Sequence, residues 1–216
     1  MELKGKKVVI IGDSITEGAG TTSVDFRYSN VFGAMSGATV YTYGIGGTRI
    51  ARKSTPSDNA RWDLCFLDRA EEMEPDADVV VVFGGTNDYG HGDAPLGRFN
   101  STDEYTFYGA MHSLVKRLVN RYPGAVIVFM TPLHRSGEGT PHTVRDGSSA
   151  ALKDYVKAIR EICEYYALPV LDLYSMSGLQ PAIPIIKEKF MPDGLHPNNA
   201  GAKIIAERLT GFLRAF

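Results

Sequence analysis

The chain has 216 residues, of which 44% are hydrophobic, 22% charged and 10% aromatic. These are the proportions of an ordinary globular domain, and they exclude a disordered chain, a collagen and a coiled coil. Lysine and arginine number 23 and aspartate and glutamate 25, so the net charge is −2. There is no basic excess for binding nucleic acid or an anionic membrane. The length favours one domain over residues 1–216.

The cysteines and the N-terminal residues bear on the compartment in which the protein works. Cys65 and Cys163 are 98 positions apart and neither belongs to a CxxC pair, so we expect two reduced thiols, with one disulfide as the open alternative. The N-terminal apolar run, residues 8–11, is shorter than the roughly 7–15 residues of a signal-peptide core. No apolar run reaches the length of a membrane-spanning helix. These features favour a cytoplasmic protein, although export by another route stays open.

Short apolar segments alternate with longer amphipathic stretches along the chain. Strands are predicted at residues 7–11, 39–43, 79–83, 126–130 and 168–173. Helical spacing of apolar residues predicts helices over 104–122, 149–167 and 198–214, with weaker patterns over 18–37 and 60–74. Pro197 suits the first position of the last helix. Five strand-then-helix units indicate an α/β domain with a parallel sheet, and long irregular stretches of the kind seen between these elements are usually functional.

Glycine-rich clusters follow the first three predicted strands. They are Gly12-Asp13-Ser14, Gly44-Ile45-Gly46-Gly47-Thr48 and Gly84-Gly85-Thr86-Asn87-Asp88. Ligands of open parallel sheets bind outside the carboxyl ends of the strands. If the strand order is the common 2-1-3-4-5, all three clusters share one edge of the sheet, and we expect the functional site there.

Several other interpretations of these glycines fail in detail. A dinucleotide fingerprint starting at Gly44 needs a glycine where the chain has Arg49, and a phosphate loop starting at Gly12 needs Gly-Lys where the chain has Glu17-Gly18. No serine lies in a G-x-S-x-G elbow. The histidines show no metal-ligand spacing such as H-E-x-x-H. We therefore expect neither a metal nor a cofactor.

A fourth cluster, Asp193-Gly194-Leu195-His196-Pro197, lies near the C-terminus. Pro197 biases His196 away from helical geometry. Such a turn can place the Asp193 carboxylate beside the imidazole, which orients one ring nitrogen and leaves the other free. A serine nucleophile needs a base of this kind.

Taken together, the four clusters resemble the SGNH hydrolases, also called the GDSL esterase/lipase family. The resemblance spans residues 12–197, and the clusters occur in the family's order. It implies a flavodoxin-like three-layer α/β/α sandwich with a five-stranded parallel sheet. It also implies that Ser14 is the nucleophile, His196 the general base and Asp193 the residue that orients His196. The backbone N–H groups of Ser14 and Gly47 and the side-chain amide of Asn87 would form the oxyanion hole.

Two positions depart from the family's pattern. The first cluster continues as Gly-Asp-Ser-Ile instead of Gly-Asp-Ser-Leu, a change that affects only packing. The asparagine that the family often carries five residues before its second-cluster glycine is Thr42 here. The Gly47 loop therefore lacks the asparagine that often supports it, whereas the Gly47 N–H donor itself is retained.

The remaining polar and aromatic residues are expected to have supporting roles. Asp13 and Asp88 should brace the site through local hydrogen bonds. We expect His112 to be structural and the other loop histidines to be surface residues, with substrate contact as the alternative: His91, His134 and His142. Five aromatic residues are expected to pack rather than form a binding platform: Trp62, Tyr89, Phe99, Tyr105 and Tyr108.

The resemblance implies a serine ester hydrolase that acts on a small-molecule ester. Among the family's substrates, short-chain acyl esters are favoured, and acetylated carbohydrates are the natural class we expect. The alternatives are a lysophospholipase or thioesterase, and a catalytically silent ligand-binding module with the same fold. A flavodoxin-like phosphate or cofactor binder is disfavoured by the failed glycine fingerprints.

Overall fold

Five parallel strands form the central sheet of the computed structural model, which describes residues 1–216. In sheet order they are β2 (Thr39–Gly44), β1 (Lys7–Gly12), β3 (Val79–Phe83), β4 (Val126–Met130) and β7 (Val170–Leu171). The expected 2-1-3-4-5 order is therefore confirmed. In register, Gly12 lies beside both Gly44 and Phe83. The three glycine clusters consequently begin side by side at one edge.

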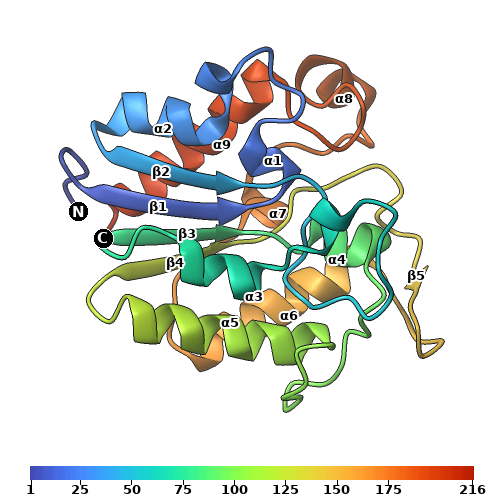
Figure 1. Cartoon of the computed structure of the whole chain (residues 1–216). Coiled ribbons are helices and arrows are strands. Elements are labelled where there is room, and N and C mark those ends of the chain that lie inside the picture. Colours follow the sequence, from blue (N-terminus) through green and yellow to red (C-terminus); the bar gives the residue numbers. More distant parts are fainter.

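Helices cover both faces of the sheet (Figure 1). Val8 and Ile10 of β1 pack in a core with α2 and α9, whereas Val9 and Ile11 pack in a second core with α3, α5 and α6. This alternation is what a strand buried on both faces requires. The predicted three-layer α/β/α sandwich is confirmed. The main helices are α2 (Tyr28–Ser36), α5 (Phe107–Arg121), α6 (Leu152–Tyr165) and α9 (Asn199–Arg214).

Capping side chains decide where the long helices begin. The Thr106 hydroxyl accepts a hydrogen bond from the Gly109 N–H at 3.2 Å, so α5 starts at Phe107 and not near residue 104. The Asn198 side chain accepts from the N–H groups of two residues of the first turn of α9. Helix α9 therefore starts after Asn198, and the prediction that Pro197 occupies its first position is wrong.

The last strand is also shorter than the sequence predicts. Only Val170 and Leu171 pair with β4, although residues 168–173 were expected to be extended. Pro169 has no N–H to donate to a ladder, and its carbonyl alone accepts a bond, from the Phe129 N–H. After Leu171 the chain turns at once into α7 (Leu173–Met176).

The remaining elements of the chain are short, and most of them lie in the long irregular stretches and the two weaker helical regions. Helix α2 occupies only the second half of 18–37, and 60–74 is broken into three pieces. These short elements are α1 (Ser14–Glu17), η1 (Val24–Phe26), η2 (Ala60–Asp63), α3 (Phe66–Arg69), η3 (Ala70–Glu72), α4 (Thr86–His91), β5 (His142–Thr143), β6 (Ser149–Ala150) and α8 (Pro184–Phe190).

Two further observations concern the cysteines and the helices. Cys65 and Cys163 are both buried and are not joined in a disulfide. None of the helices combines the length and apolar character needed to cross a bilayer.

Candidate active site

Ser14 is the first residue of α1, at the carboxyl end of β1. The preceding residue, Asp13, caps this short helix, because its carboxylate accepts a hydrogen bond from the Ile15 N–H at 3.0 Å. Thr16 on the same turn is buried and shares a hydrogen bond of 2.9 Å with the Tyr28 hydroxyl of α2. The turn that carries Ser14 is thus fixed from both sides.

Ser14 and His196 are 182 residues apart in the sequence, yet Oγ of Ser14 lies 3.0 Å from Nε2 of His196. The other ring nitrogen, Nδ1, lies 2.6 Å from Oδ2 of Asp193. Oδ1 of Asp193 accepts the N–H groups of Leu195 at 2.8 Å and His196 at 2.7 Å. The structure therefore brings the three predicted triad residues into one hydrogen-bonded chain.

The electrostatics of Asp193 suit a carboxylate that stays ionised. Partial burial on its own would raise its pKa. The hydrogen bonds donated by the backbone and ring of His196 and by the Leu195 N–H outweigh burial and hold the pKa of Asp193 below its usual range. An ionised Asp193 keeps the proton of His196 on Nδ1 and leaves Nε2 free to accept one from Ser14.

Gly194 lets the loop after β4 approach the turn that carries His196. Its φ is +80°, and a Cβ built there would lie 2.2 Å from Oγ of Ser136. The Ser136 N–H donates to the Gly194 carbonyl at 2.8 Å. Ser136 consequently packs directly against the turn that joins Asp193 to His196.

Two backbone donors are available near Ser14. The β2 loop passes close to it, since a Cβ on Gly46 would lie 3.5 Å from Cβ of Ser14. Gly47 has φ +79°, and a Cβ there would lie 2.2 Å from Cδ1 of Trp62, so only glycine fits. The Gly46 N–H donates to Glu17 at 2.8 Å, whereas the N–H groups of Ser14 and Gly47 donate to no group in the chain. Both are free to bind an anion.

Asn87 lies at the start of α4 and is buried. Its Nδ2 donates a hydrogen bond of 3.0 Å to the carbonyl of Thr48, the residue after Gly47. An amide nitrogen has two hydrogens, and this bond uses one of them. Asn87 therefore ties the third cluster to the second and keeps one N–H for a ligand.

Asp13 and Asp88 are buried beside these residues and accept hydrogen bonds from backbone N–H groups. This is the supporting role that the sequence predicts for them. The Asp88 carboxylate accepts the N–H groups of Ile50 at 3.0 Å and Ala51 at 2.8 Å, and Asp13 caps α1. Burial raises the pKa of each, Asp13 and Asp88, to about 6, against the lowering effect of those hydrogen bonds. Neither carboxylate belongs to the Ser14–His196–Asp193 chain.

Arg69 is the supporting residue that sequence reasoning missed. It is buried, and its guanidinium donates to the Gly12 carbonyl at 3.1 Å, to the Thr48 hydroxyl at 2.7 Å and to the Tyr43 carbonyl. Burial lowers the pKa of Arg69 to about 10. Thr42 instead points toward α2, where its hydroxyl donates to Ser29 at 3.0 Å. The loop is thus held by an arginine from α3, whereas the residue at the position of the family's asparagine, Thr42, bonds to α2.

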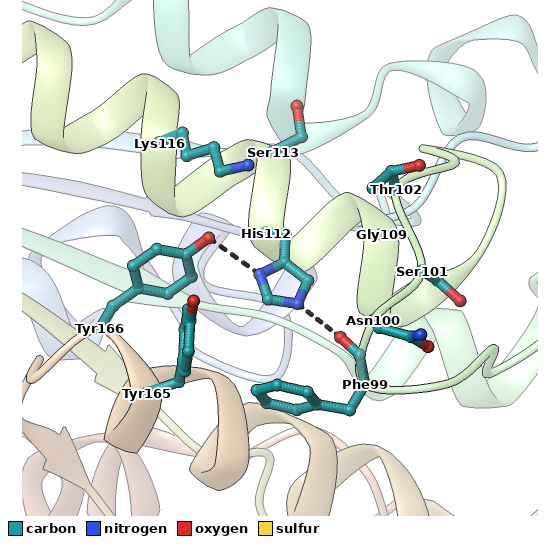
Figure 2. A pocket seen from close by; sticks show the side chains of 10 residues that line it. All are labelled: Phe99, Asn100, Ser101, Thr102, Gly109, His112, Ser113, Lys116, Tyr165 and Tyr166. Carbon is teal, nitrogen blue, oxygen red and sulfur yellow. Dashed lines mark hydrogen bonds between the residues drawn. The ribbon is translucent and has the colours of Figure 1, made fainter.

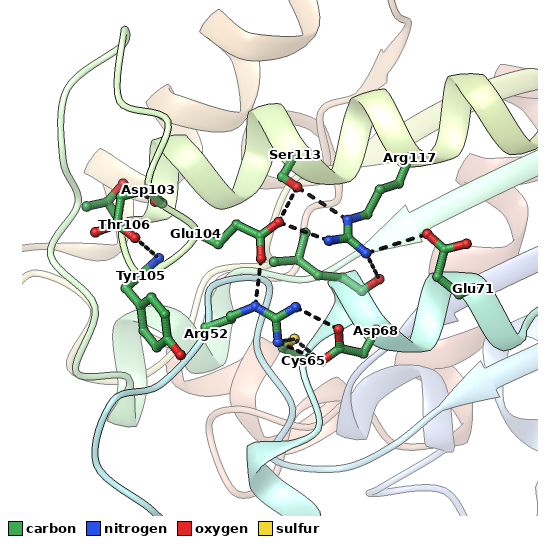
Figure 3. A network of polar contacts seen from close by, with 11 residues as sticks. Arg52, Cys65, Asp68, Glu71, Asp103, Glu104, Tyr105, Thr106, Ser113 and Arg117 are labelled. Atoms are coloured by element: carbon green, nitrogen blue, oxygen red, sulfur yellow. Dashed lines mark hydrogen bonds and ion pairs between the residues drawn. The ribbon is translucent and has the colours of Figure 1, made fainter.

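A polar network anchors the far end of the same loop (Figure 3). Arg52, directly after Ala51, donates to Asp68 of α3 and to Glu104, each at 2.7 Å. Glu104 also accepts from Arg117 of α5 at 3.0 Å. The segment between Gly47 and Arg52 is therefore fixed at both ends.

Trp62 packs against the second glycine cluster, as expected of a packing residue, but is only partly covered. Its ring lies against Gly47 and keeps 41% of its surface exposed. The His91 ring lies beside it, with 5.9 Å between ring centroids, and accepts a hydrogen bond from Arg49 at 3.1 Å. Tyr89 and Tyr108 are buried as expected, whereas two more of these aromatics are about as exposed as Trp62: Phe99 and Tyr105.

The other histidines also have specific contacts. His134 stacks on Tyr174 at 3.9 Å between ring centroids and pairs with Glu138 at 2.6 Å. His142 donates from Nε2 to the Gly92 carbonyl at 3.1 Å. Both are partly buried rather than plain surface residues. The side chains contain no group of three or more His, Cys, Asp or Glu that could hold a metal ion.

A cavity of about 340 Å³ on the α5–α6 face is lined by none of the proposed triad and oxyanion-hole residues (Figure 2). His112 lies at its base, bonded to the Tyr166 hydroxyl at 2.9 Å and to the Phe99 carbonyl at 2.6 Å. His112 therefore joins two elements, which is the structural role expected of it.

One known protein family matches most of the chain. The sequence model of the GDSL-like lipase/acylhydrolase family matches residues 10–204. A search of curated proteins gives no match.

Solved structures match over the whole chain. One is 36% identical with a TM-score of 0.86, covering 100% of this chain and 99% of its own. A protein from Lactobacillus plantarum is 31% identical with a TM-score of 0.82, covering 99% and 98%. A two-domain esterase active on acetylated mannans is 21% identical with a TM-score of 0.62, and the match covers 99% of this chain but 49% of that protein.

Proposed function

The chain belongs to the GDSL-like lipase/acylhydrolase family, and on that premise we propose that it is a serine ester hydrolase with a Ser14–His196–Asp193 triad. The observation that carries the proposal is the hydrogen-bonded chain, with 3.0 Å from Ser14 Oγ to His196 Nε2 and 2.6 Å from His196 Nδ1 to Asp193. These distances match those needed for a nucleophile, its base and the group that orients the base.

In the proposed mechanism, Ser14 Oγ attacks the ester carbonyl carbon while His196 Nε2 takes the hydroxyl proton. The carbonyl oxygen becomes negative in the tetrahedral intermediate. It is stabilised by the N–H groups of Ser14 and Gly47 and by the free N–H of Asn87. His196 then gives its proton to the leaving alcohol, which leaves an acyl group on Ser14. Water, deprotonated by His196, releases the acid and restores the hydroxyl.

We further propose that the acyl group is short and that acetylated carbohydrates are the natural substrates. Five cavities of about 190–360 Å³ lie elsewhere on the molecule, and Ser14 lines none of them, which supports a short acyl group over a long one. Trp62 offers an exposed ring next to Gly47, a surface on which a sugar could stack. The acetylmannan-active relative makes acetylated mannan a direct choice of test substrate.

The experiment is a hydrolysis panel of 4-nitrophenyl esters from acetyl to palmitoyl, together with acetylated mannan, for the wild type and Ser14→Ala. We expect the highest kcat/KM at acetyl to butyryl and no turnover by Ser14→Ala. A maximum at long chains would favour the lysophospholipase alternative. Full activity in Ser14→Ala would overturn the proposal, and hydrolysis of none of the esters would favour the silent binding module.

A further inference from the structure

A second cavity, of about 200 Å³, lies between α4, the loop after β4 and the start of β5. It is lined by Tyr89, Gly90, Arg135, Ser136, Thr140, Pro141 and His142. Its lining is mostly polar and includes one guanidinium, hydroxyl groups and an imidazole, but no carboxylate.

This cavity adjoins both halves of the candidate active site. On one side, Ser136 contacts Gly194 of the triad turn, with 2.8 Å between its N–H and the Gly194 carbonyl. On the other, Gly90 lies three residues after Asn87 on α4, and a Cβ at Gly90 would lie 2.7 Å from Nη1 of Arg135. A substrate group in this cavity would therefore belong to a molecule whose ester bond lies at Ser14.

Arg135 is a cation without an acidic partner. Its Nη1 donates to the carbonyl and hydroxyl of Thr86 at 3.1 and 3.2 Å, and its guanidinium lies 5.4 Å from the centre of the Tyr89 ring. Its Nε is buried and has no hydrogen-bond partner, and no carboxylate forms an ion pair with the guanidinium. Arg135 is half-buried, and a cation partly withdrawn from water is usually paired with an acid, because desolvating an unpaired charge is costly.

The acids around Arg135 are engaged elsewhere. Glu138 accepts the backbone N–H of Arg135 at 3.0 Å and pairs with His134 at 2.6 Å. Asp193 is bonded to His196, and Asp13 caps α1. These carboxylates act on the guanidinium only from a distance, and burial holds the pKa of Arg135 below its usual range.

We propose that this cavity binds a carboxylate of the substrate, so that the preferred esters are acidic ones. The inference rests on the proposed esterase function and narrows its substrate class. A guanidinium binds a carboxylate through its N–H groups, and Nη2 of Arg135 donates to no group in the chain, whereas Nη1 is bonded to Thr86 and Nε is buried out of reach of a ligand. A single cation balances the single charge of a carboxylate. The carboxylate belongs either to the acyl part or to the alcohol part of the ester.

Two matched pairs of substrates show whether the carboxylate belongs to the acyl part or to the alcohol part of the ester. For the acyl part, mono-4-nitrophenyl glutarate is compared with 4-nitrophenyl valerate. For the alcohol part, an acetylated methyl glucuronoside is compared with the same acetylated methyl glucoside. In at least one pair, we expect wild-type kcat/KM to favour the acidic ester by about tenfold or more, through KM.

Arg135→Gln should reduce that preference by about tenfold or more, and Arg135→Lys should keep part of it. The matched control is Arg98→Gln, which removes the same charge from an exposed position outside the cavity and should leave the preference as in the wild type. If Arg135 only braces Thr86, both members of a pair lose the same factor in Arg135→Gln and the ratio does not change, which overturns the proposal.

The wild type alone also decides the question if the variant does not fold. Equal hydrolysis of both members in both pairs would overturn the carboxylate site and leave the serine esterase standing. Unaltered hydrolysis by Ser14→Ala would instead overturn the esterase on which it rests.

Discussion

The side-chain amide of Asn87 donates a hydrogen bond of 3.0 Å to the main-chain carbonyl of Thr48. Asn87 comes from the third cluster and Thr48 from the second, so this bond fixes the distance between two proposed donors of the oxyanion hole. The same nitrogen has a second hydrogen, and Asn87 therefore combines loop support with a donor for the substrate.

We expect Asn87→Ala to lower kcat by roughly 10²–10³ and to leave KM nearly unchanged, because the oxyanion forms only after attack. The lost bond to Thr48 should cost about 1 kcal/mol of unfolding free energy. Steady-state kinetics and denaturant unfolding measure the two effects. Asn120→Ala, at an exposed position on α5, is the control for truncating an asparagine. A raised KM with intact kcat would make Asn87 a ground-state binding residue.

Asp193→Asn should lower kcat by about 10⁴, and His196→Ala should lower it by about 10⁶. In Asp193→Asn, the amide Oδ1 can still accept the N–H groups of Leu195 and His196. Its NH₂ would then face Nδ1 of His196 and force the ring proton onto Nε2, where it blocks proton transfer from Ser14. Rates and circular dichroism of both variants check this. Equal kcat for Asp193→Asn and the wild type would exclude the orienting role.

Much of this arrangement could be predicted from the sequence, because it depends on residues with strong local preferences. The β-branched runs and the glycines after them predict the strands, and the parallel order places Ser14, Gly47 and Asn87 at one edge. The turn with Pro197 predicts that Asp193 and His196 are neighbours. These patterns are local, and together with the order of the strands they are enough to predict which residues meet at the site.

The supporting residues could not be predicted, because they act across long sequence separations. Arg69 belongs to an ordinary amphipathic stretch, and only the fold shows that its guanidinium ends among the acceptors of the Gly47 loop. Likewise, nothing local to Arg135 shows that it lacks an acidic partner. One signal was available for Arg69: at helical spacing it falls on the apolar side of its stretch, three residues after Phe66 and four before Met73, where an arginine needs buried acceptors.

Arg69→Met should lower both stability and kcat. It leaves the Tyr43 carbonyl and the Thr48 hydroxyl without the arginine donor and removes one of the two hydrogen bonds that the Gly12 carbonyl accepts, which should cost about 3 kcal/mol of unfolding free energy. The Gly47 loop should then hold its N–H less well, so kcat falls more than KM rises. Arg69→Lys keeps the charge but loses the branched set of N–H donors. Its stability and kcat should lie between those of the wild type and those of Arg69→Met. Wild-type kcat in Arg69→Met would show that the loop needs no such support.

Asp88 should make the stability depend on pH in a recognisable direction. Its folded pKa of about 6 lies above the ordinary value of 3.8, so the native state binds the proton more tightly than the unfolded state. Unfolding free energy from this group is therefore lost as pH rises from about 4 to about 6, by about 3 kcal/mol in total.

The difference between the wild type and Asp88→Asn isolates this contribution. Relative to Asp88→Asn, the wild type should lose unfolding free energy as pH rises from about 4 to about 6, and the difference should be constant above that. Chemical denaturation at each pH measures it. Asp25→Asn, which removes a carboxylate from an exposed position, is the control for the change of charge. A constant difference between the wild type and Asp88→Asn across the whole range would contradict the raised pKa of Asp88.

The most direct test of the central claim is covalent labelling by a fluorophosphonate, followed by peptide mass spectrometry. A phosphonyl group should be found on Ser14 alone, at one per chain, and its attachment should abolish ester hydrolysis. Labelling should be lost in Ser14→Ala and slowed strongly in His196→Ala, because His196 activates the hydroxyl 3.0 Å away. Attachment to a different residue, or full ester hydrolysis by protein labelled at Ser14, would contradict the account.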